Sequence, residues 1–177
     1  VQFKDKTLLI TGGGTGIGEA IAYQFAQRGT NVILSGLGEE QLRKVEERCR
    51  QYGVKAWHKE VNLESSESID ALVEYVDSLG VKPDFFVLNA GISQRALTLD
   101  CDIALDRKLM EINYFGGIYI IKKFKEHLKT AKEIHIAVTT SISGLFGFPL
   151  RSAYCASKHA LFGFYESLEL EYPNIKV

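Results

Sequence analysis

The 177-residue sequence lacks a surplus of charge, a long apolar run and any pair of cysteines in CxxC spacing. Its 21 basic and 22 acidic residues give a net charge of −1, so no electrostatic signal points to nucleic acid or to an anionic membrane surface as a partner. No run of about 18 apolar residues predicts a membrane span. These absences favour neither a nucleic-acid-binding nor a membrane-spanning protein.

The few cysteines and histidines carry little signal of their own. Cys49, Cys101 and Cys155 are typical of reduced thiols, which favours an intracellular, by default cytoplasmic, location. The four histidines show no metal-ligand spacing, so no metal site is predicted. The chain begins at Val1, which leaves open an upstream signal or membrane anchor. No linker, repeat or low-complexity tract divides residues 1–177, and we expect one domain.

Strand and helix patterns alternate along the chain. Apolar runs predict strands at residues 8–10, 32–34, 54–61, 85–88 and 134–140, and helical spacing predicts helices at about 17–29, 42–49, 69–79, 104–129 and 152–171. This alternation predicts an α/β fold, a doubly wound parallel sheet covered on both faces. Another α/β sheet, such as a flavodoxin-like one, is the alternative.

Residues 11–18, TGGGTGIG, follow the first strand and open the first helix. Glycines permit a tight turn and let the backbone approach a pyrophosphate, for which the helix N-terminus offers unpaired N–H groups and a partial positive charge. The spacing is T-G-x-x-x-G-x-G, and no P-loop lysine follows, which argues against a nucleoside triphosphatase. A glycine-rich turn without a ligand is the alternative interpretation.

Near the end of the chain, Tyr154 and Lys158 stand four residues apart and therefore share one face of the predicted last helix. Small residues around them permit close packing of another group. Taken alone, such a pair is more often a buried ring beside a solvated ammonium.

Five motifs occur in order: TGGGTGIG at 11–18, LNAG at 88–91, Asn113, Ser141 and YCASK at 154–158. This set resembles the short-chain dehydrogenase/reductase family across all 177 residues. The resemblance implies a Rossmann-like domain, an NAD(P) cofactor and an alcohol or carbonyl substrate. The stretch SGLFGFPLRSAYCASKHAL is also similar to 11β-hydroxysteroid dehydrogenases and related lipid-carbonyl reductases, which implies a lipid-like substrate.

The resemblance also implies roles for four catalytic residues. Tyr154 would exchange the proton of the substrate oxygen, and Lys158 would supply positive charge to it and bind the nicotinamide ribose. Ser141 would hold the carbonyl oxygen, and Asn113 would anchor a water that links Lys158 to solvent. Ser143 is a neighbouring rival to Ser141, and either serine is compatible with a simple turn. Asn113 alone is compatible with a helix kink or cap.

The family pattern implies a set of cofactor-binding residues. They are Gly12, Gly14, Thr15, Gly16, Ile17, Gly18, Leu37, Asn62, Leu63, Asn89, Ala90, Gly91, Tyr154 and Lys158. Asn62 replaces the aspartate that contacts adenine in many members, and its side-chain oxygen can still accept a hydrogen bond from an amino group.

The choice between NAD and NADP is not clearly signalled. Gly36 stands where NAD-dependent members usually carry an acid, and Leu37 and Thr15 stand where NADP-dependent members often carry a base. Without a carboxylate at Gly36 the main repulsion of a 2′-phosphate is missing, and the helix N-terminus at residues 38–40 offers N–H groups to it. We therefore expect a preference for NADP(H) over NAD(H) of less than about tenfold.

Taken together, the sequence predicts an oxidoreductase that transfers a hydride between a nicotinamide cofactor and a small alcohol or carbonyl compound. A non-catalytic dinucleotide-binding or interaction protein, and an epimerase or dehydratase of the same family, are the alternatives. The helices at 104–129 and 152–171 predict a homodimer, or a tetramer built from it. The family resemblance implies that the chain ends at Val177, where a sixth strand would begin, and lacks the C-terminal third of the fold.

Overall fold

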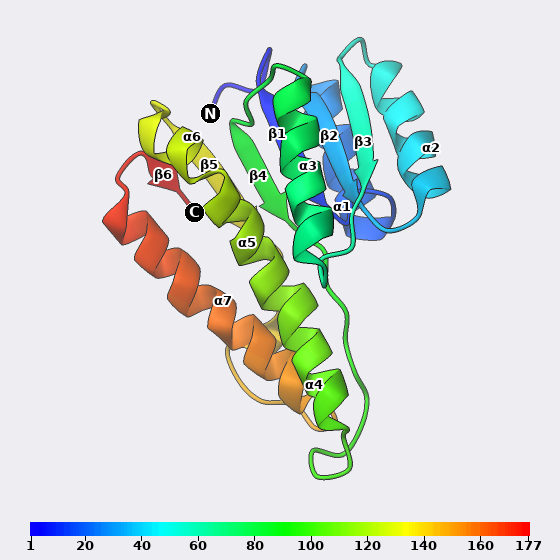
Figure 1. Ribbon diagram of the computed structural model, residues 1–177, viewed down its shortest axis with the longest axis vertical. Helices are drawn as coiled ribbons and strands as arrows, with labels where there is room; N and C mark the ends of the chain where they lie inside the picture. Colours follow the sequence, from blue (N-terminus) through cyan, green and yellow to red (C-terminus); the bar gives the residue numbers. More distant parts are fainter.

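The protein is a six-stranded parallel sheet with helices on both faces, seen in a computed structural model that describes residues 1–177 (Figure 1). The strand order is β3-β2-β1-β4-β5-β6. That order is the one found in Rossmann folds, whereas flavodoxin-like sheets have the order 2-1-3-4-5. The predicted doubly wound sheet is therefore confirmed, and the flavodoxin-like alternative is wrong.

The elements follow one another as strand and helix from end to end. The strands are β1 (Thr7–Thr11), β2 (Asn31–Gly36), β3 (Ala56–Glu60), β4 (Phe85–Leu88), β5 (Ile134–Val138) and β6 (Ile175–Lys176). The α-helices are α1 (Gly16–Gln27), α2 (Glu39–Arg50), α3 (Ser66–Ser78), α4 (Ile103–Met110), α5 (Gly116–Lys123), α6 (Lys125–Thr130) and α7 (Ser152–Glu171). None of them combines the length and the apolar character that crossing a membrane requires.

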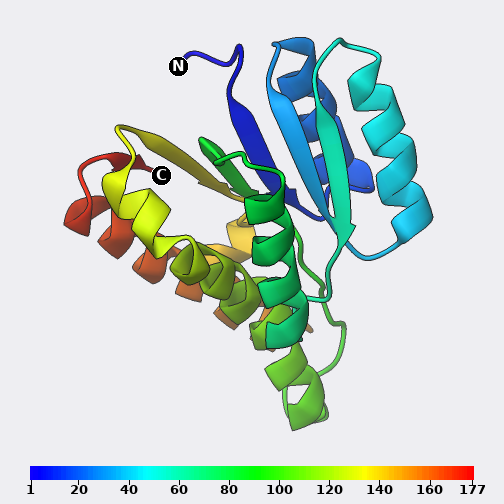
Figure 2. The same ribbon diagram turned by 45° about the horizontal axis from the view of Figure 1, so that its top comes forward.

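Alternation of side chains along the strands divides the core into two layers. Leu8 and Ile10 of β1 pack into a cluster with Ala22 of α1 and Leu42 of α2, whereas Leu9 packs into a second cluster on the other face. The second cluster receives residues from α3, α5 and α7. Figure 2 shows the resulting three layers, with α1 and α2 on one face of the sheet and α3, α5 and α7 on the other. Because both faces are covered, β4 and the interior of β1, residues 8–10, are apolar.

The long helix expected at 104–129 is not one continuous α-helix. A π-helical turn, η1 (Glu111–Phe115), separates α4 from α5, and the helix breaks again at Phe124 before α6. A π-turn accommodates one extra residue per turn and often marks a functional site. Here it contains Asn113, whose side chain is buried.

The sixth strand begins before the end of the chain, which corrects the expectation that it would start at Val177. Pro173 cannot continue α7, and Asn174 then donates hydrogen bonds from Nδ2 to the carbonyl oxygens of Leu128 (2.8 Å) and Ala131 (3.0 Å). This turn places Ile175 opposite Ile134 of β5, with its side chain fully buried. Burial of one apolar side chain and pairing with β5 define β6.

We expect Asn174→Ala to lower the free energy of unfolding by about 1–2 kcal/mol, because two carbonyl groups at the end of α6 lose their donor. Chemical denaturation monitored by circular dichroism measures this. Ser167→Ala is the control, since its hydroxyl bonds to Gly163 on an exposed face of α7. Equal effects of the two substitutions would contradict a role of Asn174 in holding β6.

Candidate active site

Strand order reverses between β1 and β4, and the loops at the carboxyl ends of the strands meet there. In open α/β sheets this crevice is where ligands bind. The glycine loop 11–18 lies on one side of it, and residues 89–91 follow β4 on the other. The residues predicted from the five sequence motifs lie around this crevice or on the neighbouring elements η1, α7 and η2, a short 3₁₀ helix at Ile142–Gly144.

The glycine loop is pressed against the first turn of α1. A Cβ atom on Gly18 would lie 2.1 Å from the carbonyl oxygen of Gly12, so only glycine fits at position 18. Thr15, the N-cap of α1, makes no side-chain capping bond. The first N–H groups of α1 are therefore available to an anion, as the sequence predicts for a pyrophosphate.

Asn89 and Thr11 join the ends of β1, β4 and β5. The Thr11 hydroxyl oxygen accepts hydrogen bonds from the backbone N–H groups of Asn89 (3.0 Å) and Ala90 (3.1 Å). The Asn89 amide donates to the carbonyl oxygens of Thr11 and Gly12, both at 3.4 Å, and accepts a bond from the Thr139 hydroxyl at 3.1 Å. These contacts set the position of the loop that follows β4.

A groove of about 270 Å³ runs along these loop ends. Many of the predicted cofactor residues line it, namely Gly12, Thr15, Leu37, Asn62, Leu63, Asn89, Ala90 and Gly91. Gly36, Val61, Ile92 and Ile112 also line it and were not predicted. Gly14, Gly16, Ile17 and Gly18 do not line it, because they form the loop backbone and the start of α1 rather than its walls.

Asn62 uses its side-chain oxygen locally. The Oδ1 atom accepts a hydrogen bond from the backbone N–H of Glu64 at 3.0 Å, which closes the turn between β3 and α3. An amide oxygen has two lone pairs, so one remains for another donor. The contact of Asn62 with adenine stays a prediction.

Tyr154 and Lys158 lie one turn apart on α7. The Lys158 ammonium nitrogen is 5.8 Å from the centre of the Tyr154 ring and donates a 2.6 Å hydrogen bond to the carbonyl oxygen of Thr139. Lys158 is only 4% exposed, and this burial lowers the pKa of its ammonium group from the ordinary value. The positive charge is thus held in a weakly screened place beside the tyrosine.

Asn113 is 5% exposed and ties the π-turn to the loop after β4. Its Oδ1 accepts from the N–H of Ile92 (2.8 Å), and its Nδ2 donates to the carbonyl oxygen of Ile92 (2.9 Å) and to the hydroxyl of Ser157 (3.0 Å). A Cβ atom on Gly91 would be 3.1 Å from Asn113 Oδ1 and 3.6 Å from Lys158 Nζ, so the three groups converge. The water relay assigned to Asn113 stays a prediction.

Ser141 caps the short 3₁₀ helix η2 (Ile142–Gly144) and accepts a 3.1 Å hydrogen bond from the backbone N–H of Ser143. Ser141, Ser143 and Tyr154 line one cavity of about 570 Å³. The remaining lining residues are Ser93, Arg95, Ile142, Phe148, Pro149, Leu150 and Arg151. Sequence and structure thus bring Ser141 and Tyr154 to the same cavity, together with the rival Ser143.

Gln94 is a site residue that sequence reasoning missed. It is 5% exposed; its Oε1 accepts from the backbone N–H of Tyr154 (3.0 Å), and its Nε2 donates to the Ser152 hydroxyl (3.4 Å). The N-cap residue Arg151 offers no side-chain cap, so Gln94 caps α7 from a different loop. The only sequence signal was a polar residue close after the LNAG motif, which by itself predicts nothing.

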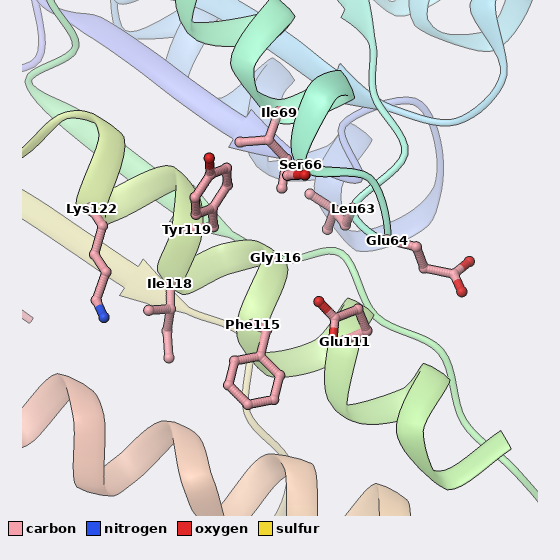
Figure 3. A pocket seen from close by; sticks show the side chains of 10 residues that line it. All are labelled: Leu63, Glu64, Ser66, Ile69, Glu111, Phe115, Gly116, Ile118, Tyr119 and Lys122. Atoms are coloured by element: carbon pink, nitrogen blue, oxygen red, sulfur yellow. The ribbon is translucent and has the colours of Figure 1, made fainter. Parts of the chain in front are cut away.

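A separate cavity of about 230 Å³ lies between α3 and the η1–α5 segment, and Figure 3 shows its lining side chains. Phe115, Glu111 and Tyr119 come from the long helical segment, and Ser66 and Ile69 come from α3. Among the predicted site residues only Leu63 reaches it. No cluster of three or more histidine, cysteine, aspartate or glutamate side chains is arranged to hold a metal ion.

The family model of the short chain dehydrogenases matches residues 6–177. Human dehydrogenase/reductase SDR family member 7 is 35% identical over 184 residues, covering 99% of this chain and 54% of the human protein. Dehydrogenase/reductase SDR family member 7B of Xenopus tropicalis is 33% identical, covering 95% of this chain and 56% of that protein. The chain thus spans about half the length of the curated relatives that it matches.

Solved structures show the same fold. NAD⁺-bound xylitol dehydrogenase superposes with a TM-score of 0.92 at 31% identity, covering all of this chain and 69% of that one. An alcohol dehydrogenase from the archaeon Thermococcus sibiricus, complexed with 5-hydroxy-NADP, superposes with a TM-score of 0.91 at 26% identity, covering 96% of this chain and 72% of that one.

We expect Thr11→Val to lower the free energy of unfolding by about 1–3 kcal/mol, because the N–H groups of Asn89 and Ala90 lose their common acceptor. Thr7→Val is a matched control, since Thr7 is buried on the same strand and its hydroxyl makes no hydrogen bond. Urea denaturation of both variants measures the difference. Equal losses of unfolding free energy in the two variants would contradict a role of the Thr11 hydroxyl in holding the loop after β4.

Proposed function

The chain belongs to the short-chain dehydrogenase family, and on that premise we propose that it transfers a hydride between a nicotinamide dinucleotide and an alcohol or carbonyl compound. One observation carries the proposal. Tyr154 lines the same cavity as Ser141, while Lys158, buried behind it, is hydrogen-bonded to the strand end that also positions the cofactor groove. A binding module has no need of that arrangement.

The groove fits a dinucleotide. The uncapped N-terminus of α1 would receive the pyrophosphate, and Gly12 and Gly91 keep the groove wall free of side chains. Residues Leu37, Asn62 and Leu63 at the ends of β2 and β3 would enclose the adenosine half. When bound, the nicotinamide ring supplies or accepts the hydride.

Tyr154 exchanges a proton with the substrate oxygen. Its phenol is partly exposed in the cavity, and the Lys158 ammonium, 5.8 Å from the centre of the ring, lies near the negative charge that develops as the proton leaves. Burial of Lys158 makes its positive charge more effective, because little water screens it. The Ser141 hydroxyl, at the start of η2, orients the same substrate oxygen.

The substrate cavity combines apolar and cationic side chains. Ile142 and Phe148 present apolar surface, while Arg151 lies with its guanidinium 5.9 Å from the centre of the Tyr154 ring and bonds to the Ser93 hydroxyl. The apolar side chains support a small, lipid-like alcohol or carbonyl substrate, as proposed from the lipid-carbonyl branch.

A homodimer, or a tetramer built from it, is the proposed assembly. Segments α4, η1 and α5 run beside α7 (Figure 1); the ring of Phe115 on η1 is half-exposed, and Gly163 on α7 is exposed. An apolar face of this kind is suited to burial against a second copy. Gly116, by contrast, is buried against Leu63 within the chain.

Tyr154→Phe removes the proton donor and retains the ring, so we expect turnover to fall by more than about 100-fold while binding of the reduced cofactor stays within about twofold. Lys158→Met should reduce both turnover and binding. Nicotinamide absorbance follows turnover, and fluorescence titration follows binding. Tyr172→Phe, remote from the cavity, is the control. A protein that binds cofactor but changes no absorbance with any alcohol or ketone would be a non-catalytic binder, an epimerase or a dehydratase instead.

Light scattering at micromolar concentration should give the mass of a dimer or tetramer. Phe115→Asp should shift the mass towards the monomer, because burying a carboxylate in the interface between two copies is costly when no cation pairs with it. Leu170→Asp is the control, since Leu170 is exposed at the far end of α7. A strictly monomeric wild-type protein would contradict the assembly.

A further inference from the structure

Gly36 leaves the end of β2 without a carboxylate, but Glu60 of the neighbouring strand β3 supplies one nearby. Glu60, the last residue of β3, accepts a 2.8 Å hydrogen bond at Oε1 from the backbone N–H of Gly38. Gly38 is the N-cap of α2 and follows Gly36 and Leu37, the positions that contact the ribose 2′ substituent in Rossmann folds. The two strands are neighbours, with Gly36 paired to Glu60.

The backbone at the end of β2 leaves no room for an acid of its own. Gly36 has φ +150°, and a Cβ atom there would lie 3.3 Å from the Cα of Gly12 in the glycine loop. A side chain at position 36 is therefore strained and crowded. Glu60 brings negative charge to the same corner from the adjacent strand, without disturbing that contact.

The N-terminus of α2 is also already occupied by anions. The N–H group of Gly38, one of those expected to bind a phosphate, donates its hydrogen bond to Glu60. Glu39 and Glu40 stand in the first turn of α2. Carboxylates near a helix N-terminus satisfy its partial positive charge, which leaves less of it for a ligand.

The cationic side chains near Glu60 each contact another group of the chain. His58 bonds to Glu39 and Glu46; burial works to lower the pKa of His58, but the two carboxylates outweigh burial and raise it. Lys44 pairs with Glu40. Lys59, next to Glu60 on β3, lines the same open cavity as Glu60, and its ammonium lies over the Tyr75 ring, 6.0 Å from the ring centre.

Glu60 lies next to the cofactor groove. It lines a neighbouring open cavity that shares Leu37 and Asn62 with the groove, and Leu37 is 71% exposed between them. A 2′-phosphate on a ribose seated at Gly36 and Leu37 would therefore face the Glu60 carboxylate. Like charges at such a contact discriminate against the ligand that carries the extra charge.

We propose that Glu60 is a specificity-determining residue that rejects the 2′-phosphate, so that the protein prefers NAD(H) over NADP(H). This inference rests on the proposed function and reverses the NADP(H) preference expected from Gly36 alone. The 2′-phosphate is repelled by a carboxylate of β3 that is hydrogen-bonded to the start of α2, rather than by an acid at the end of β2.

The test is fluorescence titration of wild type and Glu60→Gln with NADH and with NADPH. Glutamine retains an oxygen that accepts the Gly38 bond but removes the charge. Wild type should bind NADH at least about tenfold more tightly than NADPH. The substitution should tighten NADPH binding by about tenfold and leave NADH within about twofold. Glu47→Gln is the matched control. It also removes one carboxylate charge, but from a position on α2 about two turns beyond the N-terminus of that helix, where Glu47 pairs with Arg43.

Ionic strength supplies a second readout. Because the rejection is electrostatic and near the surface, the NADH preference of wild type should shrink as salt is raised, whereas a purely steric rejection would not respond. The inference fails if wild type binds NADPH as tightly as NADH, or if Glu60→Gln leaves the ratio of the two affinities unchanged. If neither NADH nor NADPH binds wild type, both the proposed function and the inference about Glu60 fail.

Discussion

The side-chain amide of Asn89 is the contact on which the rest of the site depends. It joins the carboxyl ends of three strands, because it bonds to the backbone of Thr11 and Gly12 after β1 and accepts from Thr139 after β5. The carbonyl oxygen of Thr139 in turn holds the ammonium of Lys158. A single chain of hydrogen bonds thus runs from the glycine loop to α7, and members of such a network support one another.

A second network places Tyr154. Ser157 accepts from Asn113 and donates to the carbonyl oxygen of Tyr154, while Gln94 accepts from the Tyr154 N–H. The π-turn at 111–115 and the loop after β4 therefore both hold the first turns of α7. This explains why an asparagine is buried in the π-turn, since it satisfies both backbone groups of Ile92.

The two networks meet at Gly91, where Asn113 and Lys158 approach the backbone. On one side lies the groove that ends in Leu37 and Asn62, and on the other lies the cavity of Ser141 and Tyr154. The groove is lined mainly by glycine, asparagine and aliphatic residues, and the cavity mainly by arginine, serine, aliphatic and aromatic residues. Membership of the short-chain dehydrogenase family accounts for the arrangement, and the proposed choice between NAD and NADP lies at its far end.

The sequence by itself determined the alternation of strands and helices, the helix limits at Ser152 and Glu171, and the motif residues that line the groove. These follow from local rules, because apolar periodicity, glycine and proline act over a few residues. Only the tertiary structure decided the π-turn, the start of β6 at Ile175, the cap that Gln94 provides, and the bond between Glu60 and Gly38. Each of these depends on groups from separate elements, 22 residues apart for Glu60 and Gly38 and 60 apart for Gln94 and Tyr154. No local pattern reports such a contact, because it exists only after the strands have taken their order in the sheet.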